Sequence, residues 1–151
     1  MKNKEMILSI MRRQGRIDAL ELRQQAKDLT GTELIDREAQ IPAFDPGKDY
    51  SKWPTGAPVA DGGQVWTLIL PHNAAHYFGR PADLRALWGL AHTKDPDQAK
   101  PWVAPLGTSG LYAAQEVCTH NGFVWRNLRE GNEYAPGTLG AEEFWEKIRE
   151  V

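Results

Sequence analysis

The chain has 151 residues, of which 41% are hydrophobic and 25% charged, with a formal net charge of −2. Its apolar runs are far shorter than the ~20 residues that a membrane-spanning helix needs, so no membrane partner is expected. Its single cysteine, Cys118, excludes an internal disulfide, so any small module must be held together by packing.

Positive charge is concentrated at the N-terminus. Residues 1–29 contain seven Lys and Arg against four Asp and Glu, whereas residues 30–151 contain eleven against sixteen. This balance does not favour nucleic acid as a partner. The apolar stretch near Met1 is interrupted by Ser9 and followed by Arg12, which does not fit a signal peptide, so we expect synthesis in the cytoplasm.

The N-terminal quarter of the chain has helical character. Two stretches are predicted with Gly15 at their junction, and Asp18 is a plausible N-cap for the second, over residues 19–29. The segment that begins at Thr30 is expected to stop this helix, and Thr32 to cap one further turn. The prediction is therefore two helices and a short third one.

One face of these helices is apolar. Its members follow spacings of three and four residues: Leu8, Met11, Ala19, Leu22, Ala26 and Leu29. Two explanations stay open at this point: the face packs onto the rest of this chain, or it forms a seam between identical chains, as in a short coiled coil.

From Ile41 onward Pro, Gly and aromatic residues dominate, and turn signals recur, which predicts short strands and loops. A degenerate repeat is visible in the order of its landmarks. The first copy contains Phe44, Tyr50, Val59, Gly62, Gly63, Val65, Trp66, Leu87 and Trp88. The second contains Trp102, Tyr112, Val117, Asn121, Gly122, Val124, Trp125, Phe144 and Trp145.

Each copy is predicted to be a three-stranded meander with a tight Gly-Gly or Asn-Gly turn. The predicted fold class is α+β, with a helical oligomerisation or packing segment over 1–40 and two small antiparallel three-stranded β modules over 41–93 and 94–151. The expected core aromatics are Tyr50, Trp66, Trp88, Tyr112, Trp125 and Trp145.

Two segments between these landmarks have patterns of their own. Residues 81–90 are typical of a short amphipathic helix with Leu84, Leu87 and Trp88 on one side. Residues 93–101 are polar and bounded by proline, which favours an inter-module linker.

The second repeat, from Trp102 through Asn121 and Gly122 to Trp145, resembles the small modules of carbohydrate-binding families five and twelve, which bind chitin. The first repeat matches this pattern more loosely. The helical lead-in followed by two such modules is similar to bacteriophage tail proteins. This resemblance implies a virion structural protein that adheres to host-surface glycans.

The chain departs from the chitin-binding pattern at one place. The exposed aromatic pair that follows the second strand in those families is replaced by residues 126–129, which read Arg-Asn-Leu-Arg. A relocated sugar platform stays open as an alternative, because flat aromatic rings stack on sugar faces. The candidate glycan-binding residues are Trp102, Tyr134, Tyr77 and Trp53, of which Trp53 is expected to be exposed among turn residues.

Other chemistry is disfavoured by the sequence. His72 and His76 have the spacing of a helical metal pair, but the surrounding prolines argue against a helix there. Cys118 and His120 could form a nucleophile and base only with an oxyanion donor that nothing in the sequence indicates. We therefore predict no catalytic residues, no metal and no cofactor.

These observations favour a non-enzymatic phage or prophage structural protein of the tail, baseplate or tail fibre, located in the virion. Its expected partners are other tail proteins, a host-surface glycan and further copies of itself, most naturally as a trimer. A carbohydrate-binding accessory module that works beside a glycoside hydrolase is the alternative, and a small enzyme of another type is a third hypothesis.

Overall fold

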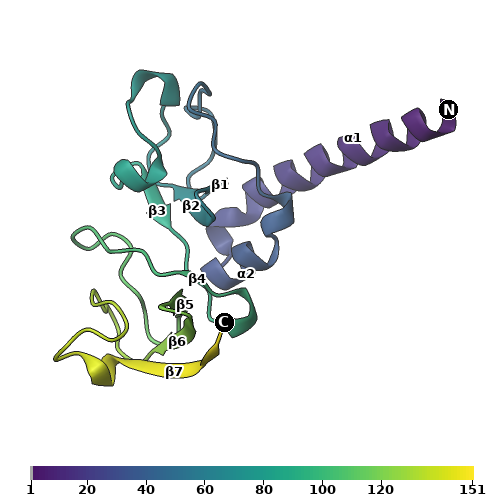
Figure 1. Ribbon diagram of the computed structural model, residues 1–151. Coiled ribbons are helices and arrows are strands. Elements are labelled where there is room, and N and C mark those ends of the chain that lie inside the picture. Colours follow the sequence, from purple (N-terminus) through teal and green to yellow (C-terminus); the bar gives the residue numbers. More distant parts are fainter. Residues whose placement is uncertain (1) are drawn as a thin grey trace.

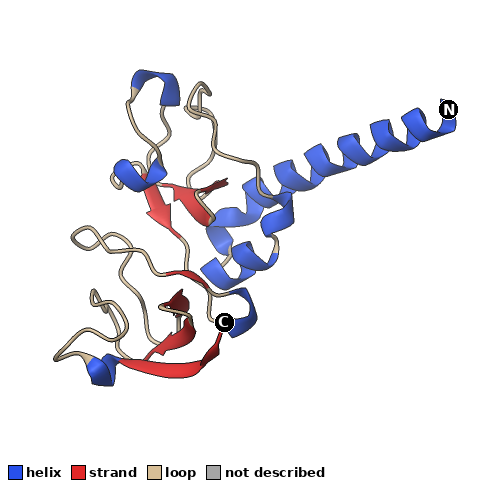
Figure 2. Ribbon diagram, viewed as in Figure 1, coloured by secondary structure: helices blue, strands red, loops and turns tan. Residues whose placement is uncertain are grey.

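The computed structural model describes residues 2–151 and confirms the α+β class, with a long N-terminal helix followed by two small sheets (Figures 1 and 2). The helices are α1 (Lys2–Gln25) and α2 (Gly31–Asp36). The first sheet contains β1 (Pro58–Asp61), β2 (Gln64–Leu68) and β3 (Trp88–Leu90). The second contains β4 (Lys100–Pro101), β5 (Val117–His120), β6 (Phe123–Asn127) and β7 (Trp145–Glu150).

Helix α1 is continuous through Gly15, so the predicted break at this residue is wrong. A glycine inside a helix costs about 1 kcal/mol relative to alanine, but it keeps its N–H and does not end the helix. Asp18 accordingly lies in the helix interior, where it accepts a hydrogen bond from Gln14 at 2.8 Å instead of capping a new helix.

The short helix α2 is capped by Thr30 and not, as predicted, by Thr32. Thr30 Oγ1 accepts a hydrogen bond from the Glu33 backbone N–H at 3.2 Å, and Glu33 Oε1 accepts one from the Thr30 N–H at 3.0 Å. This reciprocal pair satisfies two backbone donors at the helix start. The next residue, Gly31, has to be a glycine. Its Cα lies against the backbone of His92, and a Cβ there would clash with the His92 carbonyl oxygen.

The apolar face of α1 is covered by the chain itself only near its C-terminal end. Leu22 and Ala26 are buried in a cluster with Leu34 and Val65, which joins the helices to the first sheet. Towards the N-terminus the same face is uncovered, and Met11 is 63% exposed. The prediction that the chain packs against this face is therefore confirmed for one part of the helix alone.

The first sheet is antiparallel, in the order β1-β2-β3, and surrounds an aromatic cluster. Tyr50 and Trp88 are fully buried and meet edge to face, with ring centroids 5.3 Å apart. The Tyr50 hydroxyl accepts a hydrogen bond from the Asp45 N–H at 2.9 Å, which satisfies its polar end inside the core.

The second sheet repeats the meander and adds a short strand. β5, β6 and β7 are antiparallel, and β4 joins β5 in parallel through two residue pairs. Tyr112, Cys118 and Trp145 form its buried core. Trp125, predicted as core, is only half-buried and packs against this cluster from outside.

The two hairpins correspond residue by residue at a separation of 59 positions, which takes Trp66 to Trp125. Each indole N–H donates to the carbonyl five residues earlier, on Asp61 at 3.2 Å and on His120 at 2.9 Å. The strand register pairs Trp66 with Val59 and Trp125 with Cys118. Val59 therefore corresponds to Cys118. The repeat predicted from the sequence had matched Val59 with Val117 instead.

The amphipathic helix predicted over residues 81–90 is wrong. Only Pro81–Asp83 form a helical turn, and Trp88 begins strand β3. Pairing with β2 places Trp88 opposite Leu68 and buries the indole completely, which a surface helix could not do. Tertiary pairing thus overrides the local helical pattern.

The segment 93–101 is an ordered bridge between the sheets. The Thr93 carbonyl accepts a hydrogen bond from the Val117 N–H at 2.8 Å. Lys100 binds the Glu38 carboxylate at 2.7 Å and the Gly63 carbonyl at 3.1 Å. The helical segment and both sheets therefore meet at this polar strip.

Candidate functional site

The structure places the four predicted glycan-binding aromatics in separate environments. Trp102 and Tyr134 line two different hollows. The four rings differ in their exposure and in the groups that lie beside them.

Trp53 is half-buried, so the expectation that it is exposed is wrong. Its ring meets Tyr50 edge to face with centroids 4.7 Å apart, and the Arg23 guanidinium of helix α1 lies 3.6 Å from the ring centroid. This cation–π contact covers a face that a sugar would need. Trp53 therefore anchors helix α1 to the first module.

Tyr77 lies in the first module just after the helical turn Ala74–His76 and is 45% exposed. Its ring meets the edge of His72 at 5.2 Å. The neighbouring Phe78 is fully exposed and was not among the predicted site residues. These two rings offer exposed apolar contact surface.

Trp102 is half-buried beside His120, with ring centroids 5.7 Å apart. It lines a shallow hollow of about 350 Å³ together with Asn121 and Val151. Its indole N–H is buried and has no hydrogen-bond partner among the described residues. Of the two hollows described in the second module, this one is the weaker candidate for a sugar site, because Trp102 and His120 are its only ring-bearing side chains apart from proline.

Tyr134 lines the more promising hollow, which we call the aromatic hollow. It has a volume of about 200 Å³ and is lined by Arg129, Tyr134, Leu139, Gly140, Ala141 and Phe144. The Tyr134 and Phe144 rings are 5.9 Å apart and tilted by 41°. The sequence indicates Phe144 only as a repeat landmark, and no local signal shows that residues 135–143 return it to the side of Tyr134.

Buried polar side chains hold Tyr134 in place. The Asn132 side chain accepts a hydrogen bond from the Tyr134 N–H at 2.9 Å, and the Tyr134 carbonyl accepts one from the Trp145 indole at 2.8 Å. Asn132 in turn donates to the fully buried Asn127 at 2.9 Å. The backbone of Tyr134 is therefore fixed to the module core on both sides.

Arg129 supplies charge at the aromatic hollow. Its guanidinium lies 4.4 Å from the Phe144 ring centroid and its side chain is exposed. A guanidinium offers five N–H donors, which suit hydroxyl or carboxylate oxygens of a sugar. The guanidinium also covers one face of Phe144, as Arg23 covers one face of Trp53, so the exposed ring for stacking on a sugar is Tyr134, with the Arg129 donors beside it.

Glu142, two residues before Phe144 in the sequence, is held in its charged form. Glu142 accepts hydrogen bonds from the Gly140 N–H at 3.0 Å, and contacts with its own backbone N–H and that of Gly140 lower the pKa of this carboxyl. A carboxyl with a lowered pKa is a poor general acid near neutral pH.

Cys118 lies inside the second core and is fully buried. Burial raises the pKa of its thiol to about 12. A thiol with such a pKa is protonated at neutral pH and is a weak nucleophile. Across residues 2–151, no three His, Cys, Asp or Glu side chains are grouped as a metal site would require.

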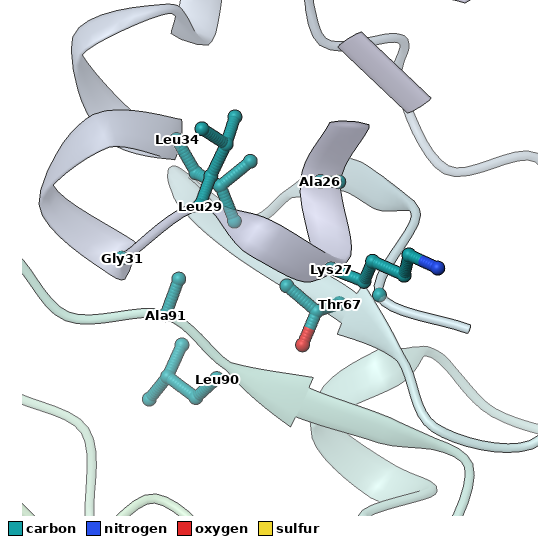
Figure 3. A pocket seen from close by; sticks show the side chains of 9 residues that line it. Ala26, Lys27, Leu29, Gly31, Leu34, Thr67, Leu90 and Ala91 are labelled. Atoms are coloured by element: carbon teal, nitrogen blue, oxygen red, sulfur yellow. The ribbon is translucent and has the colours of Figure 1, made fainter. Parts of the chain in front are cut away.

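A further hollow of about 280 Å³ lies between the helical segment and the first sheet (Figure 3). Leu29, Leu34, Leu90 and Ala91 contribute its apolar walls, and the Lys27 side chain extends away from the leucines. Few polar groups converge here, so we interpret it as the packing seam between the helices and the sheet.

A scan against protein-family models and a search of curated proteins both find no match to this chain. None of the helices in residues 2–151 has the length and apolar character needed to cross a membrane.

Proposed function

We propose that this chain is a non-enzymatic structural protein of a bacteriophage or prophage tail, baseplate or tail fibre. In this role it is made in the cytoplasm, assembles with other tail proteins and with copies of itself, and contributes adhesion to a glycan on the host surface. The order of helix and tandem modules supports the proposal, through the resemblance of the second module to carbohydrate-binding families five and twelve.

The observation that carries the adhesive part is the aromatic hollow. The sequence lacks the aromatic pair that follows the second strand in the chitin-binding families, but Tyr134 and Phe144 form a pair elsewhere on the same module. Arg129 stands beside this pair with its donors exposed. These three residues are the ones that we expect to contact the sugar.

Binding of the whole chain to a glycan array of chitin oligosaccharides and bacterial wall polysaccharides tests this role. We expect Tyr134→Ala to weaken binding about tenfold, because an aromatic contact of this kind contributes about 1 kcal/mol or more. Leu106→Ala is the matched control, since Leu106 is an exposed apolar side chain of the same module that does not line the aromatic hollow. Loss of binding in the control alone, or no binding by the wild type, would refute adhesion through the aromatic hollow.

The virion role needs its own experiment. Mass spectrometry of purified phage particles from the source strain should detect the chain, and antibody labelling should place it on the tail. Particles that lack the chain would contradict the structural role even if the glycan array is positive.

The aromatic hollow equally fits a second candidate function, a carbohydrate-binding accessory module that works beside a glycoside hydrolase. Neighbouring genes discriminate between the two: genes for tail, baseplate or lysis proteins favour the virion role, and a chitinase gene favours the accessory role.

A further inference from the structure

Helix α1 has a second apolar stripe that the chain leaves uncovered. It consists of Met6, Ile10, Ile17 and Leu20, which are 60%, 57%, 42% and 48% exposed. At about 100° per residue, this stripe lies roughly opposite the buried face of Leu22 and Ala26. It is therefore distinct from the apolar face that contains Leu8, Met11, Leu22 and Ala26.

The spacing of the stripe is that of a coiled-coil seam. Positions 6, 10, 13, 17 and 20 alternate steps of four and three residues, with Ile10 and Ile17 at a positions and Met6 and Leu20 at d positions. Arg13 takes the middle d position, where a polar residue sets register at a cost in stability.

We propose that this stripe is the seam of a parallel coiled coil between copies of this chain. The occupant of each uncovered stripe is thus the same stripe of a second copy. The inference rests on the self-assembly contained in the proposed function and names the surface through which it occurs.

Charges beside the stripe favour this partner and this orientation. Arg16 and Glu21 lie on opposite sides of the layer formed by Ile17 and Leu20 and are five residues apart, at g and e positions. In a parallel coiled coil a g residue faces the e residue five positions further along the neighbouring helix, so Arg16 meets Glu21 of the next copy. In an antiparallel pairing g residues face g residues, so Arg16 would not meet Glu21.

Neither charge is used inside the monomer, because Arg16 and Glu21 make no salt bridge within residues 2–151 and both side chains are exposed. They are consequently free to pair between chains.

The helix is also accessible along most of its length. Figures 1 and 2 show α1 projecting from the two sheets, with its N-terminal end far from them. Every residue from Asn3 to Ile17 is exposed. A solvated helix of this length is marginal in water and contains Gly15 in its middle, so association with other helices supplies the burial that it lacks.

Sedimentation equilibrium of the full chain over a series of concentrations tests the seam. We expect the wild type to be oligomeric and Ile10→Asp to be monomeric. Met11→Asp is the matched control: it adds the same charge one residue away, at a similarly exposed position on another face, and should remain oligomeric. Unchanged tryptophan fluorescence in both variants will show that the sheets stay folded.

The measured mass also gives the number of chains. Three are expected from the proposed tail role, and two are favoured by Ile at a with Leu at d; either number supports the seam. A wild type that is monomeric at all concentrations overturns the proposal, and so does an Ile10→Asp variant that associates as well as Met11→Asp.

Charge exchange tests the parallel orientation. Arg16→Glu and Glu21→Arg should each weaken association at low salt, and the double variant should restore it because opposite charges again face each other. A double variant as weak as the single ones would exclude the parallel pairing. Glycan binding enters none of these measurements, so failure of the adhesive role and failure of the seam give different results.

Discussion

His92 contacts the second module with both its ring face and its Nε2 atom. Its ring stacks on Tyr112 of the second module with centroids 3.8 Å apart, and its Nε2 lies 2.9 Å from the Gly110 carbonyl oxygen. In the neutral ring Nε2–H donates this hydrogen bond. Burial lowers the pKa of His92 to about 4, so the side chain is uncharged at neutral pH.

We therefore expect stability to fall on acidification. Between about pH 6.5 and 4 the unfolded chain binds a proton at His92 that the folded chain excludes, so the His92 contribution is complete above pH 6.5 and disappears as pH falls to 4. The loss should be on the order of 2–3 kcal/mol in the free energy of unfolding.

Urea unfolding across this pH range, compared between the wild type and His92→Gln, isolates the effect. Burial also raises the pKa of Glu116, which makes stability rise on acidification. This contribution is common to both proteins, so it cancels in their difference. Parallel pH curves for the two proteins would contradict the assignment to His92.

At the scale of elements, the same type of turn precedes each of the two hairpins, but the residue with a positive φ differs between them. Gly56 has φ +91° and its N–H donates to Leu68, whereas Gln115 has φ +76° and its N–H donates to Asn127, both at 2.7 Å. The turn thus imposes a left-handed backbone on a residue that has a Cβ in the second module.

Gln115→Gly should stabilise the protein by about 0.5–1 kcal/mol, because relief of the left-handed strain exceeds the added entropy of the unfolded chain. Gly56→Ala is the reciprocal change and should destabilise it, since a Cβ there would also lie 3.0 Å from the Lys27 Cα. Chemical denaturation measures both, and a destabilised Gln115→Gly protein would show that the Gln115 side chain has another role.

At the scale of the whole molecule, the projecting part of α1 contributes little to the free energy of unfolding of the two sheets, because it packs on neither of them. Polar contacts bind the second module to the first, such as the Gln64 side-chain N–H to the Pro101 carbonyl at 2.9 Å. Leu22 and Ala26 bind the base of α1. Residues 3–17 contribute no buried side chain.

Deletion of residues 2–17 should therefore leave the melting temperature of a dilute, monomeric sample nearly unchanged. Leu22→Ala should cost about 2–4 kcal/mol, because it opens a cavity in the seam between helix and sheet. Differential scanning calorimetry compares the two. A truncation that destabilises as strongly as Leu22→Ala would mean that the projecting helix packs on the sheets.

Local signals in the sequence were sufficient to predict the α+β class and the positions of both hairpins. Asn121 and Gly122 adopt left-handed angles in the tight turn, as their residue types favour, and the indoles of Trp66, Trp88 and Trp145 are buried. These features depend on residues close together in the chain or on hydrophobicity alone. The domain boundaries and the glycan-binding assignments stay predictions.

The features decided only by tertiary structure join residues far apart in sequence. Helix α1 continues past Gly15 because a local propensity cost of about 1 kcal/mol is small beside the anchoring of its base. Trp88 lies in a strand because Leu68 offers it a buried partner, and Trp53 is covered because Arg23 reaches it. The sequence by itself determined which segments turn and which rings are apolar; contacts between distant segments decided which rings remain exposed, because burial depends on what packs against a residue.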